Sequence, residues 1–359
     1  MEASTRWLML LALFAFATSS ASASFVPSGE AGLNDAVPQR WTVNLDLPPE
    51  QRWPWPAMLP YYGGALEHAV EMIGQFIPKE YTSVIVGIAE EIGRMGYLGE
   101  YGGEIASVAK AANMSLGEAV LLNLIYEIEA GCTSIVAQGT DGTIYHGRNL
   151  DFNLAGLLRN LTIEVDFQSK GQTVFTATTY AGYVGVLTGM RPGAFSISLD
   201  QRESGSPIEN ILMALFVPGT TASCFLIRNT LRDKTTFADA VSALSNTPLA
   251  APAYIIVGGT QSGEGAVITR DREYARDVWY IDVNDGRWFE VETNDDHWRA
   301  PDDHRRGVAN QGMERLGWTN VGLKGIFDVL STHPVLNGGT TYTTLMSASL
   351  GNYSTVVRS

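Results

Sequence analysis

Cysteines and basic residues are few in this chain of 359 residues, and its histidines lack the spacing of metal ligands. Two cysteines, Cys132 and Cys224, exclude a disulfide-rich scaffold and a four-cysteine zinc site. Lysine and arginine total 24 against 38 aspartates and glutamates, a net charge of −14, and so few cations argue against nucleic-acid binding. The five histidines form no H-x-x-x-H or H-E-x-x-H pair, so no metal site is predicted.

The sequence also lacks the motifs of two large enzyme classes. There is no G-x-S-x-G elbow, which argues against an α/β-hydrolase triad. The glycines of 258–265 are not followed by Lys-Ser or Lys-Thr, so they favour a strand-to-strand turn over a phosphate loop, and no cofactor is predicted. Beyond residue 23 no uncharged apolar stretch reaches roughly 18 residues, so the mature protein is expected to be soluble or peripheral to a membrane.

An apolar run does occur at the start of the chain. Residues 7–18 are uncharged, follow Arg6, and precede Ala21-Ser22-Ala23, which fits a small-x-small cleavage site. The run is too short to span a bilayer and predicts a signal peptide over 1–23, with a buried N-terminal helix as the alternative. Entry into the secretory route makes three sequons candidate glycosylation sites, at Asn113, Asn160 and Asn352.

The remaining chain has two halves of different texture. Apolar residues at helical spacing over 58–130, with a capping box at Ser115 and Glu118, predict three or four helices. After Cys132 the pattern predicts an α+β fold with helices outside the sheets, and a division into 24–131 and 132–359. Predicted strands are 132–138, 143–147, 161–167, 173–179, 194–199, 253–257, 266–269, 277–283 and 288–292; predicted helices are 207–217, 222–232, 236–246 and 322–331.

Cys132 is the residue with the most chemical interest, because it lies where the helical half ends and the first hairpin begins. If Asp141-Gly142 forms a two-residue loop, Cys132 is opposite Asp151 on one sheet face. Arg148 then points to the other face unless a bulge turns it round. The alternatives are a buried structural Cys132, a surface or structural ion pair of Arg148 with Asp151, or a Cys132–Cys224 disulfide.

Ordered segments through the second half carry a resemblance to a known family. They are 132–152 (Cys-Thr-Ser-Ile-Val-Ala-Gln-Gly-Thr-Asp-Gly-Thr-Ile-Tyr-His-Gly-Arg-Asn-Leu-Asp-Phe), 181–189, 254–259, 267–270, 292–294 with His297-Trp298, and 342–345. This set resembles the lysosomal acid amidase and acid ceramidase family of N-terminal-nucleophile hydrolases. A cysteine with arginine at +16 and aspartate at +19 also occurs in bile salt hydrolases and penicillin V acylase.

The resemblance implies a two-chain amidase with an αββα sandwich. Self-cleavage between Gly131 and Cys132 would give an α chain of 24–131 and a β chain of 132–359, joined as a heterodimer. Cys132 would be the nucleophile and its freed α-amine the base, as N-terminal threonine hydrolases pair nucleophile and amine. By the same resemblance, Asp151 would position the amine, Arg148 would support the site, and Asn294 would stabilise the oxyanion.

One family position differs in this chain. Where the relatives have Glu-Arg after the strand at 194–199, this sequence has Gln201-Arg202, and glutamine cannot titrate. The family glutamate is associated with proton handling or self-cleavage, so slower maturation is expected unless Glu203 substitutes.

The substrate indicated by the resemblance is a lipid amide. The short segment from Asp151 to Leu161 and the absence of terminal cysteines resemble the branch that hydrolyses N-acylethanolamines. Residues 251–254, 263–265 and 332–337 instead resemble the ceramide-hydrolysing branch, which remains the alternative.

A protein of another class, a secreted lipid binder without catalysis, also fits the composition. In that case the aromatic residues of 53–62 would lie on a membrane, although the same residues could pack as core. The enzyme hypothesis likewise expects peripheral membrane contact, an acidic pH optimum and a lysosomal location.

Overall fold

The computed structural model describes residues 35–76, 79–96, 98–124, 131–202, 210, 213–214, 217 and 219–359. The predicted signal peptide over 1–23 and Glu203 lie outside these residues, as does most of the helix expected over 207–217.

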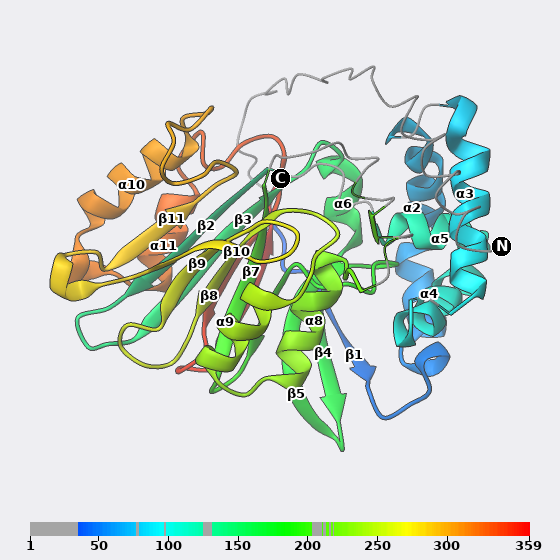
Figure 1. Cartoon of the computed structure of the whole chain (residues 1–359), viewed down its shortest axis with the longest axis horizontal. Helices are drawn as coiled ribbons and strands as arrows, with labels where there is room; N and C mark the ends of the chain where they lie inside the picture. Colours follow the sequence, from blue (N-terminus) through cyan, green and yellow to red (C-terminus); the bar gives the residue numbers. More distant parts are fainter. Residues whose placement is uncertain are drawn as a thin grey trace.

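The first half is helical, as predicted. It contains α2 (Trp55–Phe76), α3 (Lys79–Arg94), α4 (Glu100–Ala111) and α5 (Leu116–Leu122), preceded by the short η1 (Pro49–Gln51). The capping box is confirmed: the Glu118 amide donates to Ser115 Oγ at 3.2 Å, and Glu118 Oε2 accepts from the Ser115 amide at 2.8 Å. These helices gather at one end of the molecule (Figure 1).

The second half supplies most of two β-sheets. The larger sheet has the order β1-β4-β5-β6-β7-β8-β9-β10, and the smaller has the order β11-β2-β3-β12-β13. The strands of the larger sheet are β1 (Gln39–Asn44), β4 (Thr162–Ser169), β5 (Gln172–Tyr180), β6 (Thr188–Arg191), β7 (Phe195–Gln201), β8 (Ala253–Gly258), β9 (Gly265–Arg270) and β10 (Ala275–Tyr280). The strands of the smaller sheet are β11 (Phe289–Glu292), β2 (Gly131–Gln138), β3 (Ile144–Asp151), β12 (Thr340–Ser347) and β13 (Asn352–Val357). Strand β1 comes from the first half and pairs in parallel with β4, so the halves share one sheet.

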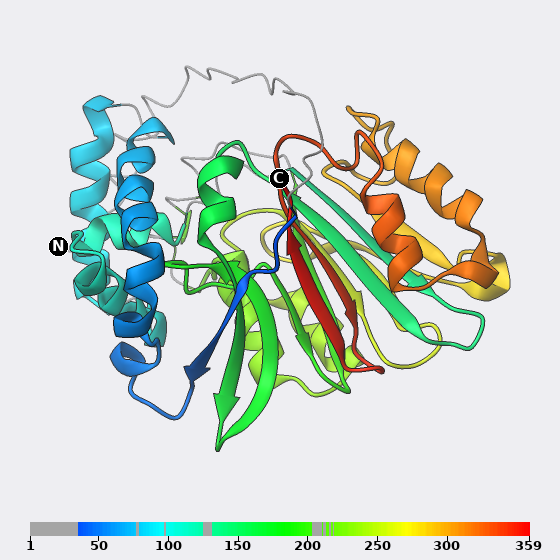
Figure 2. The same ribbon diagram turned by 180° about the vertical axis from the view of Figure 1, so that it is seen from behind.

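The two sheets face each other and carry helices on their outer faces (Figures 1 and 2). Helices α8 (Ser223–Asp233) and α9 (Phe237–Asn246) contact the larger sheet, whereas α10 (Arg305–Leu316) and α11 (Leu323–Leu330) contact the smaller one. Strand β2 contacts β7, β8 and β9 across the interface, so it is buried on both faces. The α+β class is confirmed. The structure adds α6 (Ala155–Leu161), η3 (Val283–Asp285), η4 (Trp318–Asn320), β6, β12, β13 and α10, which the sequence patterns missed.

The predicted register of the first hairpin is wrong by one residue. Cys132 pairs with Leu150, and Asp151 pairs with Gly131. The reason is the loop: Gly139 donates to the Thr143 carbonyl at 2.8 Å, and Gly142 has a φ of 87°, which gives a three-residue loop with a left-handed glycine rather than a two-residue turn. Since side chains alternate along a strand, the shift brings Arg148 to the Cys132 face without a bulge.

Most of the aromatic residues considered for membrane contact are core residues. The aromatic residues Trp53, Trp55 and Tyr62 are buried, as is Met58, whereas Tyr61 is 63% exposed. Among the described residues, no single helix has the length and apolarity to cross a membrane; α4 and α5 meet those criteria only as a pair bent by 113°.

Candidate active site

Cys132 lies near the start of β2, with its side chain fully buried between the sheets. Its Sγ accepts a hydrogen bond from Arg148 Nη2 at 3.1 Å and lies 3.8 Å from the Leu199 carbonyl oxygen. Its amide donates to Asn294 Oδ1 at 2.9 Å. Cys132 and Cys224 are not joined by a disulfide, so the disulfide alternative is wrong, and Cys224 is buried in α8. A sulfur next to a guanidinium is favoured as the thiolate, the nucleophilic form.

Arg148 is the cation that faces this sulfur. It is fully buried, and besides Cys132 it donates to Thr188 Oγ1 at 2.6 Å, to the Tyr342 hydroxyl at 3.1 Å and to the Leu199 carbonyl at 2.9 Å. These partners come from β6, β12 and β7, so both sheets hold the guanidinium in place. The alternative of a surface ion pair with Asp151 is therefore wrong, because Arg148 is buried and its ion pair is with Asp200 Oδ1 at 3.3 Å.

Asp151 lies at the end of β3, beside Gly131 and almost fully buried. Its carboxylate accepts from Thr340 Oγ1 at 2.6 Å and from Asn337 Nδ2 at 2.9 Å. Burial raises the pKa of Asp151, and the nearby Arg305 opposes that rise. A Cβ on Gly131 would lie 3.3 Å from the Asp151 Cβ and 3.7 Å from Arg305 Nη1, so this residue has little room for a side chain.

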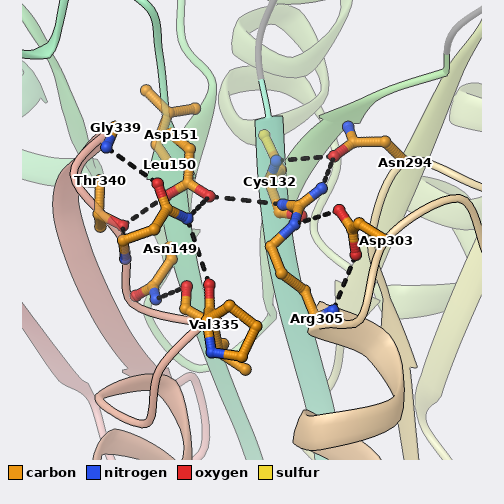
Figure 3. A network of polar contacts seen from close by, with 12 residues as sticks. Cys132, Asn149, Leu150, Asp151, Asn294, Asp303, Arg305, Val335, Gly339 and Thr340 are labelled. Atoms are coloured by element: carbon orange, nitrogen blue, oxygen red, sulfur yellow. Dashed lines mark hydrogen bonds and ion pairs between the residues drawn. The ribbon is translucent and has the colours of Figure 1, made fainter. Parts of the chain in front are cut away.

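Arg305, at the start of α10, joins these groups and was missed by sequence reasoning. Its Nη1 donates to the Cys132 carbonyl oxygen at 2.6 Å and lies 3.4 Å from Asp151 Oδ2, while its Nη2 donates to Asn294 Oδ1 at 2.8 Å. Its Nε donates to Asp303 Oδ2 at 2.5 Å, which holds the guanidinium in place. Figure 3 shows the guanidinium between Asp151 on one side and Cys132 with Asn294 on the other. No local sequence signal marks an arginine that reaches the site from another element.

Asn294 follows β11 and connects the nucleophile to β7. While its Oδ1 accepts from Cys132 and Arg305, its Nδ2 donates to the Gln201 backbone carbonyl at 2.7 Å. The structure therefore brings Cys132, Arg148, Asp151, Asn294 and the Gln201 backbone into one site. In the intact chain, the amide donor expected to meet an oxyanion is engaged by Gln201.

The other predicted sites lie on the surface. Asn113, Asn160 and Asn352 are all exposed, as glycosylation would require. Within the described part of the chain, no group of three His, Cys, Asp or Glu residues is placed to hold a metal ion.

Comparison with known proteins agrees with this geometry. A family model described as linear amide C-N hydrolases, choloylglycine hydrolase family, matches residues 132–325, beginning at the buried cysteine. The chain belongs to this family. It is similar to the N-acylethanolamine-hydrolyzing acid amidase of Mus musculus, with 43% identity over 327 residues, covering 90% of this chain and 89% of the mouse protein.

Two further similarities extend the match. Acid ceramidase of Homo sapiens is 38% identical over 359 residues, covering 93% of this chain and 89% of the human protein. The solved structure of the Caenorhabditis elegans N-acylethanolamine-hydrolyzing acid amidase ortholog aligns with a TM-score of 0.59 and 42% identity, covering 63% of this chain and 99% of that chain. As a member of the choloylglycine hydrolase family, this protein is an amide-hydrolysing enzyme. The alternative hypothesis of a lipid-binding protein without catalytic activity is therefore wrong.

Removing the Arg305 guanidinium should lower turnover strongly. We expect Arg305→Gln to reduce kcat/KM for a linear fatty acid amide by about 10²-fold, the usual effect of losing a preorganised charged donor at the reacting centre. Arg315→Gln is a matched control, because Arg315 is exposed on the same helix. Steady-state kinetics of both purified variants would check this, and equal rates would contradict a role for Arg305.

Proposed function

We propose that this enzyme is a lysosomal cysteine amidase that hydrolyses N-acylethanolamines, such as palmitoylethanolamide, to a fatty acid and ethanolamine. The observation that carries the proposal is the placement of Cys132: its sulfur faces Arg148 at 3.1 Å, its nitrogen faces Asn294 at 2.9 Å, and it directly follows Gly131. Similarity to the acid amidases over about nine-tenths of the chain supports this substrate class.

The first step is cleavage of the chain by its own nucleophile. The Cys132 sulfur attacks the Gly131 carbonyl carbon, the bond from that carbon to the Cys132 nitrogen breaks, and the nitrogen takes the thiol proton. Water then hydrolyses the resulting thioester, which frees the Gly131 carboxylate and restores the thiol. The Cys132 nitrogen is thereby an α-amine with an ordinary pKa of about 8, close enough to serve as a base.

The substrate reaction uses the same sulfur. The amine accepts the thiol proton, the sulfur attacks the amide carbonyl carbon, and the proton passes to the nitrogen of the departing ethanolamine. Water then hydrolyses the acyl thioester. Asn294 Oδ1 already accepts from the nitrogen that becomes the amine, and Arg305 lies between Asn294 and Asp151. In this proposal Asp151 positions the amine through that arginine, and the Asn294 amide stabilises the oxyanion once Gln201 releases it.

The layers of helix, sheet, sheet and helix would form the αββα sandwich of N-terminal-nucleophile hydrolases. Residues 24–131 and 132–359 would stay together as a heterodimer, since β1 remains paired with β4. The net charge of −14 would suit an acidic lumen, because partial protonation of carboxylates reduces their mutual repulsion. Exposed Tyr61 near a buried aromatic cluster supports peripheral contact with lipid.

Ceramide is the alternative substrate, favoured by the ceramidase-like segments at 251–254, 263–265 and 332–337. Purified enzyme incubated side by side with palmitoylethanolamide and ceramide at acidic pH decides between them. We expect release of ethanolamine to be the faster reaction. Faster release of sphingosine would transfer the proposal to ceramide, and hydrolysis of neither would overturn it.

A further inference from the structure

A second carboxylate shares the guanidinium that faces the nucleophile. Arg148 Nη2 donates to Cys132 Sγ at 3.1 Å and also lies 3.3 Å from Asp200 Oδ1. Asp200 is at position six of β7, in the sheet opposite β3, and both Asp200 and Arg148 have no exposed side-chain surface. One nitrogen atom therefore serves two groups that can each carry a negative charge.

We propose that Asp200 is a positioning residue that competes with the Cys132 thiolate for the positive charge of Arg148. When Asp200 is protonated, the charge of Arg148 is left to stabilise the thiolate. This inference rests on the proposed function only in taking Cys132 as the nucleophile. Placing a second anion next to one buried cation is unfavourable, because water does not screen the repulsion between them there.

A chain of neutral hydrogen bonds holds Asp200 from behind. Ser134 Oγ donates to Asp200 Oδ1 at 2.8 Å and lies 2.8 Å from Ser198 Oγ, which lies 2.9 Å from His146 Nε2. His146 Nδ1 ends the chain at Ser196 Oγ, 3.0 Å away. Burial lowers the pKa of His146 to about 3, so the imidazole is neutral and adds no positive charge beside Asp200.

Among the charged groups near Asp200, Arg148 is the one that makes a direct ion pair with it. Burial raises the pKa of Asp200 to about 7, although Arg148 and the Ser134 hydroxyl oppose the rise, and Arg305 contributes a weaker opposing field. Glu292 on β11 repels Asp200, and burial raises the pKa of Glu292 as well. The charged groups that act on Asp200 are Arg148 on β3, Glu292 on β11 and Arg305 on α10, and the titratable Tyr254 occupies the paired position of β8. Cys132 and Tyr342 contact Arg148, and His146 is joined to Asp200 only through Ser198 and Ser134.

The sign of the effect follows from these groups. Below about pH 7 Asp200 is largely protonated, and the Arg148 charge is available to the thiolate. Above that pH the ionised Asp200 takes part of the charge, and the thiolate becomes less favourable. The thiolate fraction therefore rises less with pH through neutrality than it would beside a neutral residue, and activity that depends on this thiolate rises less as well.

Asp200→Asn is the direct test, because asparagine keeps the shape but cannot ionise. We expect the ratio of the hydrolysis rate at pH 7.5 to that at pH 5 to rise about tenfold over the native enzyme, the change produced by one pKa unit of lost competition. The same shift should occur in the rate at which iodoacetamide labels Cys132, followed by mass spectrometry of its peptide, since alkylation reports the thiolate fraction.

A second variant keeps the carboxylate. Ser134→Ala removes one hydrogen bond to the ionised form of Asp200, so the suppression of the rise in labelling should persist but begin at higher pH. Asp328→Asn removes the same charge from an exposed position on α11 and should leave the native profile unchanged. Parallel labelling profiles in the native, Asp200→Asn and Ser134→Ala proteins would overturn the inference. Labelling needs no substrate, so a pH shift without amide hydrolysis would contradict the proposed function alone.

Discussion

Replacing Cys132 by alanine should leave the chain in one piece and abolish hydrolysis. In the proposed mechanism one sulfur is required twice, first against the Gly131 carbonyl and then against the substrate, and alanine performs neither step. Alanine fits the buried position of Cys132, so the variant should fold and be secreted. Denaturing electrophoresis would show one chain, whereas the native protein should show chains of 108 and 228 residues, defined by cuts after Ala23 and Gly131.

Two controls separate this outcome from general damage. Cys224→Ala removes the other buried thiol and should cut normally and retain activity, apart from a packing cost. Asp151→Asn should impair turnover while the sulfur remains available to labelling. A Cys132→Ala protein that still separates into two chains and still hydrolyses the amide would refute the assignment of the nucleophile.

Local signals in the sequence were enough for much of the fold. The four helices of the first half have apolar residues at helical spacing, and the Ser115 capping box needs only four consecutive residues. Helix α10 was missed because its sequence, Arg305–Leu316, is mostly polar, and only the sparse apolar residues Ala309, Met313 and Leu316 mark its buried side. Strand β12 was missed because threonines replace the alternation of apolar and polar residues, and their hydroxyls are satisfied by neighbouring strands.

The site shows the same division between local and distant information. Cys132, Arg148 and Asp151 belong to one hairpin, so a motif and a turn signal were sufficient to propose them together. The prediction that Cys132 shares a sheet face with Asp151 and not with Arg148 was wrong, because a loop one residue longer reverses which side chains share a face. Arg305 and Asp200 could not be found this way, since Arg305 reaches Cys132 and Asp200 reaches Arg148 from elements far along the chain, and only tertiary packing brings them there.

If the chain is cut as proposed, replacing Glu104 by glutamine should separate residues 24–131 from 132–359. Glu104 lies on α4 with no exposed surface, and Arg228 on α8 donates to both of its oxygens, at 2.7 and 2.8 Å. Arg52 and the Trp53 indole also donate to it, at 2.9 and 2.6 Å. Glutamine leaves the buried Arg228 charge without its carboxylate, a change that costs about 3–5 kcal/mol. Both cysteines lie within 132–359, so no disulfide can join this part to residues 24–131.

The intact chain provides the control for this interface. In a Cys132→Ala background, Glu104→Gln should lower the urea midpoint of unfolding while the protein still elutes as one species, because a peptide bond joins the halves. In the cleaved enzyme, the same substitution should release residues 24–131 on size-exclusion chromatography. Glu67→Gln changes an exposed glutamate on α2 and should do neither. Co-elution of both chains at unchanged stability would show that Arg228 does not depend on Glu104, and that strand β1 with apolar packing is sufficient to join them.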